Sequence, residues 1–145
     1  PSNYFTISWW DNYYTGSRAA FHTGAAGACG GFNGIWSTHS LVQVCNSAGT
    51  ATNLTFTAPA TNNTWHFYTY VFQLSSSTHV MYIDGQQQGI ATNLSAPYNN
   101  ITSLNIGIFS TACVNAGKGT TFDDFRIYSR ALSAPEIQTL YNAAK

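Results

Sequence analysis

The side chains that could carry acid–base chemistry are few in this sequence. The chain has one glutamate, Glu136, and four aspartates, of which only Asp123 and Asp124 are neighbours. Hydrolysis of a glycosidic bond needs two carboxyl groups roughly 5 to 9.5 Å apart across a cleft. Successive side chains of a strand point to opposite faces, so we expect Asp123 to point inward and Asp124 outward. This arrangement argues against a catalytic pair, and the sequence predicts that the chain is not an enzyme.

Metal ligands are also sparse. The four histidines stand 17, 27 and 13 residues apart, and the three cysteines form no Cys-x-x-Cys pair. Neither pattern has the spacing of a zinc site. Calcium takes roughly six to eight oxygen ligands, usually with several carboxylates, and the aspartates here are dispersed. We therefore expect no cofactor, with calcium as the alternative.

Aromatic side chains are the remaining candidates for ligand binding, because their rings stack on the apolar faces of sugars. We predict ligand-binding residues at Tyr13 and Tyr14, which follow the first expected strand, and at Trp9 and Trp36. For Tyr13 and Tyr14 the alternative is packing.

Composition narrows the class of partners. Charged residues make up only 7% of the 145, with five basic residues balanced by five acidic ones, against about 25% in an ordinary soluble domain. The basic residues are scattered along the chain, which argues against nucleic acid and anionic membrane surfaces as partners. No apolar run is long enough to span a membrane. Near-zero net charge removes electrostatic repulsion between copies and favours a homo-oligomer or filament.

Several residues indicate processing and an extracellular location. Sequons of the form Asn-x-Ser/Thr predict N-glycosylation at Asn53, Asn62, Asn93 and Asn100, with chance as the alternative because Asn, Ser and Thr make up 45 of the 145 residues. We predict a disulfide between Cys29 and Cys45, with three reduced thiols as the alternative. Because the first residue is Pro1, we expect a processed chain or part of a longer protein.

The elements that must position these residues are almost all strands. The strand from 65 to 74 is apolar on both faces, which predicts a place in the middle of its sheet. Asp84-Gly85 predicts a two-residue hairpin turn. Ser133 and Glu136 form a capping box that predicts one short helix at the C-terminus. Further strands are expected at 5–9, 32–36, 41–44, 54–56, 80–83, 86–90, 104–109 and 122–128. The sequence thus predicts one all-β domain over residues 1–145, a two-sheet antiparallel sandwich with a C-terminal helix.

Three stretches of the chain are similar to motifs of one known family. Residues 5–10 read FTISWW, similar to FTISAW, and Trp65-His66 followed by YIDG at 82–85 is similar to WHH…LYVDG. Residues 122–141 are similar to the ending IDDVRIYNRALSxxEIxxLY. In these motifs the chain resembles the laminin-G-like domains of the concanavalin A-like jelly-roll superfamily. The resemblance implies a jelly-roll sandwich and a secreted or cell-surface recognition or adhesion module that binds glycans or extracellular proteins.

The chain departs from that family at its beginning. The family has an earlier strand that pairs near the strand reading DDVRIY, whereas only four residues precede Phe5 here. A missing strand leaves unpaired backbone groups, which upstream sequence or a strand from a neighbouring molecule would have to cover. We therefore predict an assembly seam with residues Phe122, Asp124, Arg126 and Tyr128. The alternative function is then a structural subunit of an extracellular filament, pilus or surface layer, in which a neighbouring subunit supplies the missing strand.

Overall fold

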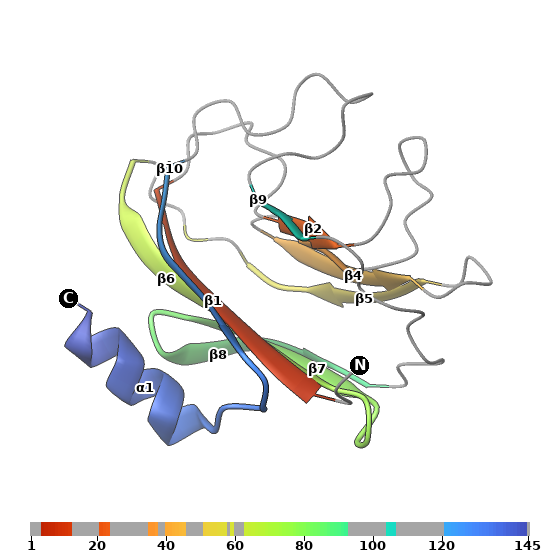
Figure 1. Cartoon of the computed structure of the whole chain (residues 1–145). Coiled ribbons are helices and arrows are strands. Elements are labelled where there is room, and N and C mark those ends of the chain that lie inside the picture. Colours follow the sequence, from red (N-terminus) through yellow and green to blue (C-terminus); the bar gives the residue numbers. More distant parts are fainter. Residues whose placement is uncertain are drawn as a thin grey trace.

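In the part of the chain that the structure describes, two antiparallel sheets face each other and a helix covers the outer face of one of them (Figure 1). The computed structural model describes residues 4–12, 21–23, 35–37, 40–45, 51–57, 59, 63–92, 104–106 and 121–144. This arrangement confirms the predicted jelly-roll sandwich with one C-terminal helix.

Each sheet has five described strands. The first sheet contains, in spatial order, β10 (Thr121–Tyr128), β1 (Tyr4–Asn12), β6 (Trp65–Gln73), β7 (Thr78–Ile83) and β8 (Gln86–Ala91). The second contains β5 (Ala51–Thr55), β4 (Leu41–Cys45), β3 (Ile35–Ser37), β2 (Phe21–Thr23) and β9 (Leu104–Ile106). The helix α1 spans Ala134–Ala143. β6 is the middle strand of its sheet, as its two apolar faces predict, whereas the three-residue β2 has too little alternation to be predicted.

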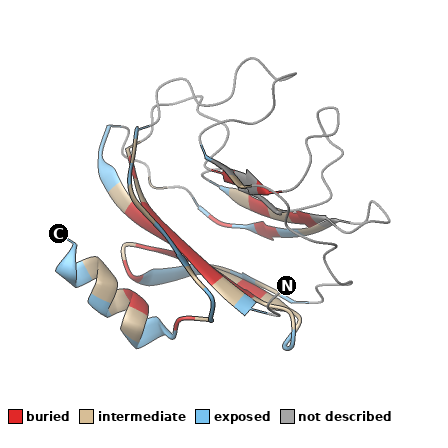
Figure 2. Cartoon of the chain, viewed as in Figure 1, coloured by how far each residue is buried: buried red, intermediate tan, exposed pale blue. Residues whose placement is uncertain are grey.

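The space between the sheets is filled mainly by aromatic and aliphatic side chains. Figure 2 shows buried residues, in red, on strands of both sheets. Trp9 of β1 is fully buried there. Its ring stacks on Tyr68 of β6, with centroids 5.4 Å apart and planes 10° apart. It also meets Phe21 of the second sheet edge-on, with centroids 5.4 Å apart. Trp9 therefore joins the two sheets, and such aromatic pairs stabilise a core by about 0.5–1.5 kcal/mol beyond their buried area.

The two sides of the sandwich differ. On one side β8 approaches β5 so closely that a Cβ atom at Gly89 would lie 3.0 Å from the carbonyl oxygen of Thr55. A side chain there would have to displace backbone, so glycine lets the two sheets meet. On the other side, where β10 and β9 end their sheets, the side chains of Ile127 and Ile106 are 59% and 39% exposed. Among the described residues the sandwich is thus closed along β5 and β8 and open along β10.

A tight turn and two hydrogen bonds fix the elements around the helix. Asp84 and Gly85 adopt φ angles of 52° and 76°, the positive values of the predicted hairpin turn. The hydroxyl of Thr6 on β1 donates to the carbonyl oxygen of Arg130 at 2.9 Å and accepts from the amide of Leu132 at 3.0 Å. Because these two residues connect β10 to α1, Thr6 sets where the helix begins.

The helix begins with the predicted capping box. Glu136 accepts hydrogen bonds from the amide and the hydroxyl of Ser133, both at 2.8 Å. Arg130, 2.7 Å away, and then these two bonds lower the pKa of Glu136 to about 2. The carboxylate is therefore charged over the whole physiological range and sits at the positive end of the helix dipole. The buried contact between helix and sheet consists of Val71, Tyr82, Leu132 and Ile137.

His79 on β7 is a fully buried histidine. Its Nδ1 lies 3.1 Å from the hydroxyl of Tyr70, and its Nε2 has no hydrogen-bond partner among the described residues. Burial lowers the pKa of His79 from 6.5 to about 4. As the pH falls through 6.5, the unfolded chain therefore takes up a proton at this site that the folded chain excludes.

We predict that the free energy of unfolding falls by about 2 kcal/mol between about pH 7.5 and pH 5.0 because of this histidine. The contribution is fully present above pH 6.5 and is lost progressively down to about pH 4. Urea unfolding of the wild type and of His79→Gln at both pH values measures it. The variant should lose this part of the pH dependence, and an equal loss in both proteins would contradict the assignment to His79.

Candidate functional site: the groove between strand β10 and helix α1

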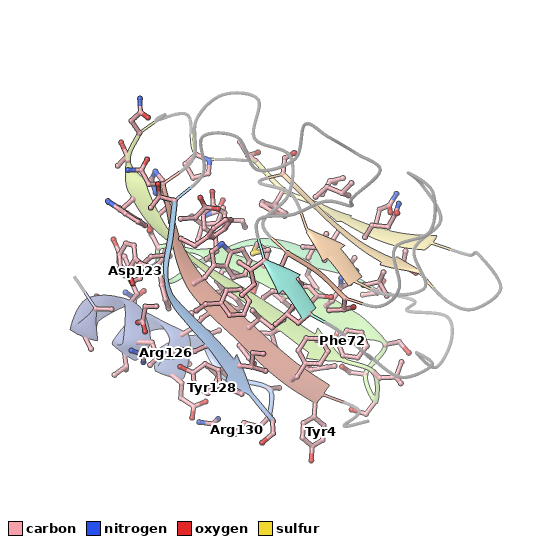
Figure 3. All side chains as sticks on the ribbon, turned by 45° about the horizontal axis from the view of Figure 1, so that its top comes forward. Tyr4, Phe72, Asp123, Arg126, Tyr128 and Arg130 are labelled. Atoms are coloured by element: carbon pink, nitrogen blue, oxygen red, sulfur yellow. The ribbon has the colours of Figure 1, made fainter. Side chains whose placement is uncertain are left out.

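Two neighbouring hollows of the described part of the chain lie on the outer face of the first sheet, between β10 and α1, and together they are called the groove. Figure 3 shows the β10 side of this groove, where Asp123, Arg126, Tyr128 and Arg130 follow one another beside the helix. One half, the polar hollow, has a volume of about 400 Å³ and is bordered by Trp10, Asp123, Asp124, Arg126 and the last turn of α1. The other half, the apolar hollow, has a volume of about 340 Å³. Leu140 borders both.

A β-bulge in β10 creates the polar hollow. Two residues of β10, Asp124 and Phe125, lie opposite the single residue Trp9 of β1. Asp124 has a φ angle of 49°, in the left-handed region that aspartate and asparagine enter more readily than most residues. Such a bulge bends the strand and shifts the alternation of its side chains.

The inward orientation expected for Asp123 is therefore wrong, whereas Asp124 lies on the outer side as expected. Phe122 and Phe125 both pack against the core between the sheets, although regular alternation would put them on opposite faces. Asp123 is exposed on the helix side and not inward, and Asp124 borders the same hollow. Because of the extra residue, Asp123 does not share a face with Phe125 and Ile127, and both carboxylates border the same hollow.

Four of the five charged side chains along the groove form ion pairs within β10 and α1. The Nε of Arg126 donates to Oδ1 of Asp124 at 2.7 Å, and this bond, followed by a smaller contribution from Tyr128, raises the pKa of Arg126. Oδ1 of Asp123 accepts the amide of Asp124 at 2.8 Å. Arg130 pairs with Glu136 at the far end of the groove. The groove therefore presents fixed polar groups of both signs without an excess of positive charge.

Trp10 supplies the aromatic wall of the polar hollow. Trp10 lies directly opposite Asp123 in the register of β1 and β10, so the two side chains share the outer face. Its ring contacts Phe67 of β6 and Tyr141 of α1, with centroids 5.4 and 6.0 Å apart. One signal in the sequence could have indicated this position of Trp10. It directly follows Trp9, and regular alternation along a strand puts one of two adjacent residues on each face.

Of the residues predicted to bind ligand, Trp9 is corrected by the structure. Its ring is fully buried between the sheets, in contact with Tyr68 and Phe21, so a sugar has no access to it. Tyr13 and Tyr14 lie outside the described residues. Trp36 is on β3, and its side chain is outside the described part.

The remaining predicted sites are only partly within the described residues. Asn53 lies on β5 with its side chain exposed, where its Oδ1 accepts a hydrogen bond from Gln43 at 2.9 Å. The other sequons, at Asn62, Asn93 and Asn100, lie outside the described residues, as does Cys29. Cys45 ends β4, and its side chain is not described.

The predicted seam residues all lie on β10 but differ in orientation. Phe122 packs inward against the core, whereas Asp124, Arg126 and Tyr128 border the groove. In the described part of the chain no strand pairs with the outer edge of β10.

Comparison with known proteins agrees with this architecture. A model of the concanavalin A-like lectin/glucanases superfamily matches residues 1–138. The chain belongs to this superfamily. The resemblance seen in the three sequence motifs is thereby confirmed. None of the curated proteins matches the chain in sequence.

Solved structures of several toxin binding domains share the fold of this concanavalin A-like chain. The receptor binding domain of botulinum neurotoxin C/D mosaic serotype matches with a TM-score of 0.72 and 15% identity, covering 98% of this chain and 36% of that one. The binding domain of botulinum neurotoxin DC matches in complex with rat synaptotagmin II, with a TM-score of 0.66 and 16% identity, covering 99% of this chain and 36% of that one. The same domain in complex with SialylT matches with a TM-score of 0.68 and 16% identity, and the coverage is again 99% and 36%. The chain thus spans about a third of the length of these neighbours.

Two properties of the described residues bear on cofactors and membranes. No three histidine, cysteine or acidic side chains in the described ranges come together as they would around a metal ion. The one helix in those ranges is too short to cross a lipid bilayer.

The left-handed conformation of Asp124 yields a stability prediction. Asp124→Ala and Asp124→Gly both remove the ion pair with Arg126, but only glycine adopts a positive φ angle at no steric cost. We expect Asp124→Ala to be less stable than Asp124→Gly by about 1 kcal/mol in urea unfolding. Equal stabilities would show that the bulge does not need the left-handed residue.

Proposed function

We propose that the chain is a non-catalytic recognition module of a secreted or cell-surface protein, which binds a carbohydrate or a protein. The observation that carries this proposal is the polar hollow, in which one aromatic ring and three charged side chains converge on a volume of about 400 Å³. Ligand sites typically combine apolar walls with a few fixed polar groups, as Trp10 and its neighbours do here. Fold analogy adds associational support, since the solved neighbours are binding domains, one in complex with a protein and one with SialylT.

Each side chain of the polar hollow has a role in this proposal. Trp10 offers an apolar ring to a sugar face or an aliphatic side chain. The carboxylate of Asp123 accepts hydrogen bonds from hydroxyl or amide donors. Arg126 is held in one orientation by Asp124 at 2.7 Å and has further N–H groups to donate. Tyr13 and Tyr14, which follow the last residue of β1, are proposed as a second set of binding residues.

We predict that the chain binds at least one member of an array of immobilised glycans and extracellular proteins, and that Asp123→Asn weakens this binding about 10- to 100-fold. The reason is the loss of a charged hydrogen-bond acceptor, a change of about 1.5–3 kcal/mol. Gln87→Ala is the matched control, because Gln87 is exposed on β8 at the far edge of the same sheet. It should leave binding unchanged.

The outcomes of this experiment separate the two proposed sets of binding residues. If Asp123→Asn has no effect while Tyr13→Ala or Tyr14→Ala weakens binding, the ligand lies at the chain segment after β1 and the groove is not the site. Binding to nothing on a broad array would contradict the recognition function itself. Unaltered thermal unfolding of each variant guards against general loss of structure.

A second candidate function is a structural subunit of an extracellular filament, pilus or surface layer. The open side of the sandwich along β10, with Ile127 59% exposed, favours it. In such an assembly a strand from a neighbouring subunit pairs with β10. Particles of many copies in light scattering, and fibres in electron microscopy, would support this function over the recognition module.

A further inference from the structure

We propose that β10 pairs, antiparallel, with the β10 of a second copy of the chain about a two-fold axis at Ile127. The first sheets of the two copies then form one continuous sheet of ten described strands. This proposal does not depend on the recognition function, because it concerns the edge of β10 and not the hollows beside it. A two-fold arrangement is closed, so it produces a dimer and not the open-ended assembly of the second candidate function.

One edge of β10 is unpaired among the described strands. β10 pairs with β1 on one side, and among the described strands none pairs with it on the other. An edge strand presents a row of backbone N–H and C=O groups that can pair with another chain. The bulge formed by Asp124 and Phe125 interrupts this row, so the regular part of the edge is Arg126 to Tyr128.

The side chain of Ile127 is an exposed apolar group on this edge strand. It lies opposite Ile7, which is only 3% exposed in the core between the sheets, so Ile127 belongs to the same inner face. Ile127 is nevertheless 59% exposed, because the core ends at this edge. A second Ile127 placed directly opposite would cover this apolar surface with an identical one.

The pattern of charges along β10 selects the register of the pairing. A two-fold axis perpendicular to the sheet keeps the inner faces of the two first sheets on the same side. Residues of the same face then lie opposite each other only if the axis passes through a residue. An axis at Arg126 places two guanidinium groups opposite each other, and an axis at Tyr128 places Arg126 opposite Arg130 of the other copy. An axis at Phe125 runs into the bulge at Asp124. Like charges directly opposite are unfavourable.

The axis at Ile127 avoids these conflicts. Arg126 then faces Tyr128 of the other copy, an arrangement that permits a cation–π contact on the outer face. Asp124 in the bulge and Arg130 after the end of β10 lie beyond the paired residues, and this register puts them at the same end, so like charges do not oppose each other there. The net charge of zero adds no general repulsion between copies.

We expect a dimer in the micromolar range, because a three-residue edge buries less than the roughly 1,200 Å² of a stable interface. Light scattering coupled to size exclusion, over a dilution series from high concentration, should show a mass that falls from twice 15.7 kDa towards 15.7 kDa. Ile127→Lys should raise the dissociation constant more than about tenfold, because it places two ammonium groups at the axis. Ile127→Thr, which keeps the strand propensity but removes apolar surface, should weaken the dimer less.

Ile90→Lys is the matched control, because Ile90 is 55% exposed on β8, the opposite edge strand of the same sheet. It should leave the dimer intact. Hydrogen exchange adds a local measurement, in which those amides of residues 126–128 that point away from β1 become protected at high concentration and exposed on dilution. A monomer at every concentration, a dimer that survives Ile127→Lys, or exchange that does not change at β10 would overturn the proposal. A large polydisperse mass would also overturn it and would support the filament subunit. Glycan binding measured on the same Ile127→Lys protein tests the recognition function separately, so the two proposals can fail independently.

Discussion

Two neighbouring tryptophans of β1 point to opposite faces of the first sheet, and the layers of the molecule depend on them. Trp9 lies between the sheets, where it stacks on Tyr68 and meets Phe21 of the second sheet. Trp10 lies on the outer face, where it contacts Phe67 and Tyr141 of the helix. One dipeptide thus joins three layers, because side chains of a strand alternate between faces and both of these are large enough to reach the neighbouring layer.

The bulge in β10 lies opposite Trp9, one of these two tryptophans. Opposite Trp9, β10 has two residues where β1 has one, and the extra residue lets both Phe122 and Phe125 turn inward to the core. The outward positions on either side of the bulge are then filled by Asp123 and Arg126, beside the helix. A local change of one residue therefore converts an edge strand into the wall of a polar hollow, at the cost of a left-handed aspartate.

Features with a local cause could be predicted from the sequence, and features that arise between distant segments could not. The hairpin turn at Asp84-Gly85 and the capping box of Ser133 are set by a few adjacent residues, and both are present in the structure. The inward orientation expected for Asp123 was wrong, since regular alternation does not anticipate an extra residue in β10. The groove itself brings Trp10 together with Leu140, 130 positions further along the chain. No spacing rule connects two such residues, and the pairing of β1 with β10 is what makes them neighbours.

The groove and the open edge of β10 are two sides of the same strand, and this adjacency has a consequence for binding. A two-fold axis perpendicular to the first sheet leaves both grooves on the same face of the joined sheet, each beside its own helix. A ligand displayed in many copies, such as a glycan on a surface, would then meet two sites at once. The second binding event becomes intramolecular, and the apparent affinity rises without any new contact to the ligand. Pairing through β10 is thus compatible with the recognition function, because it uses the outer edge of the strand and leaves the hollows beside the helix open to a ligand.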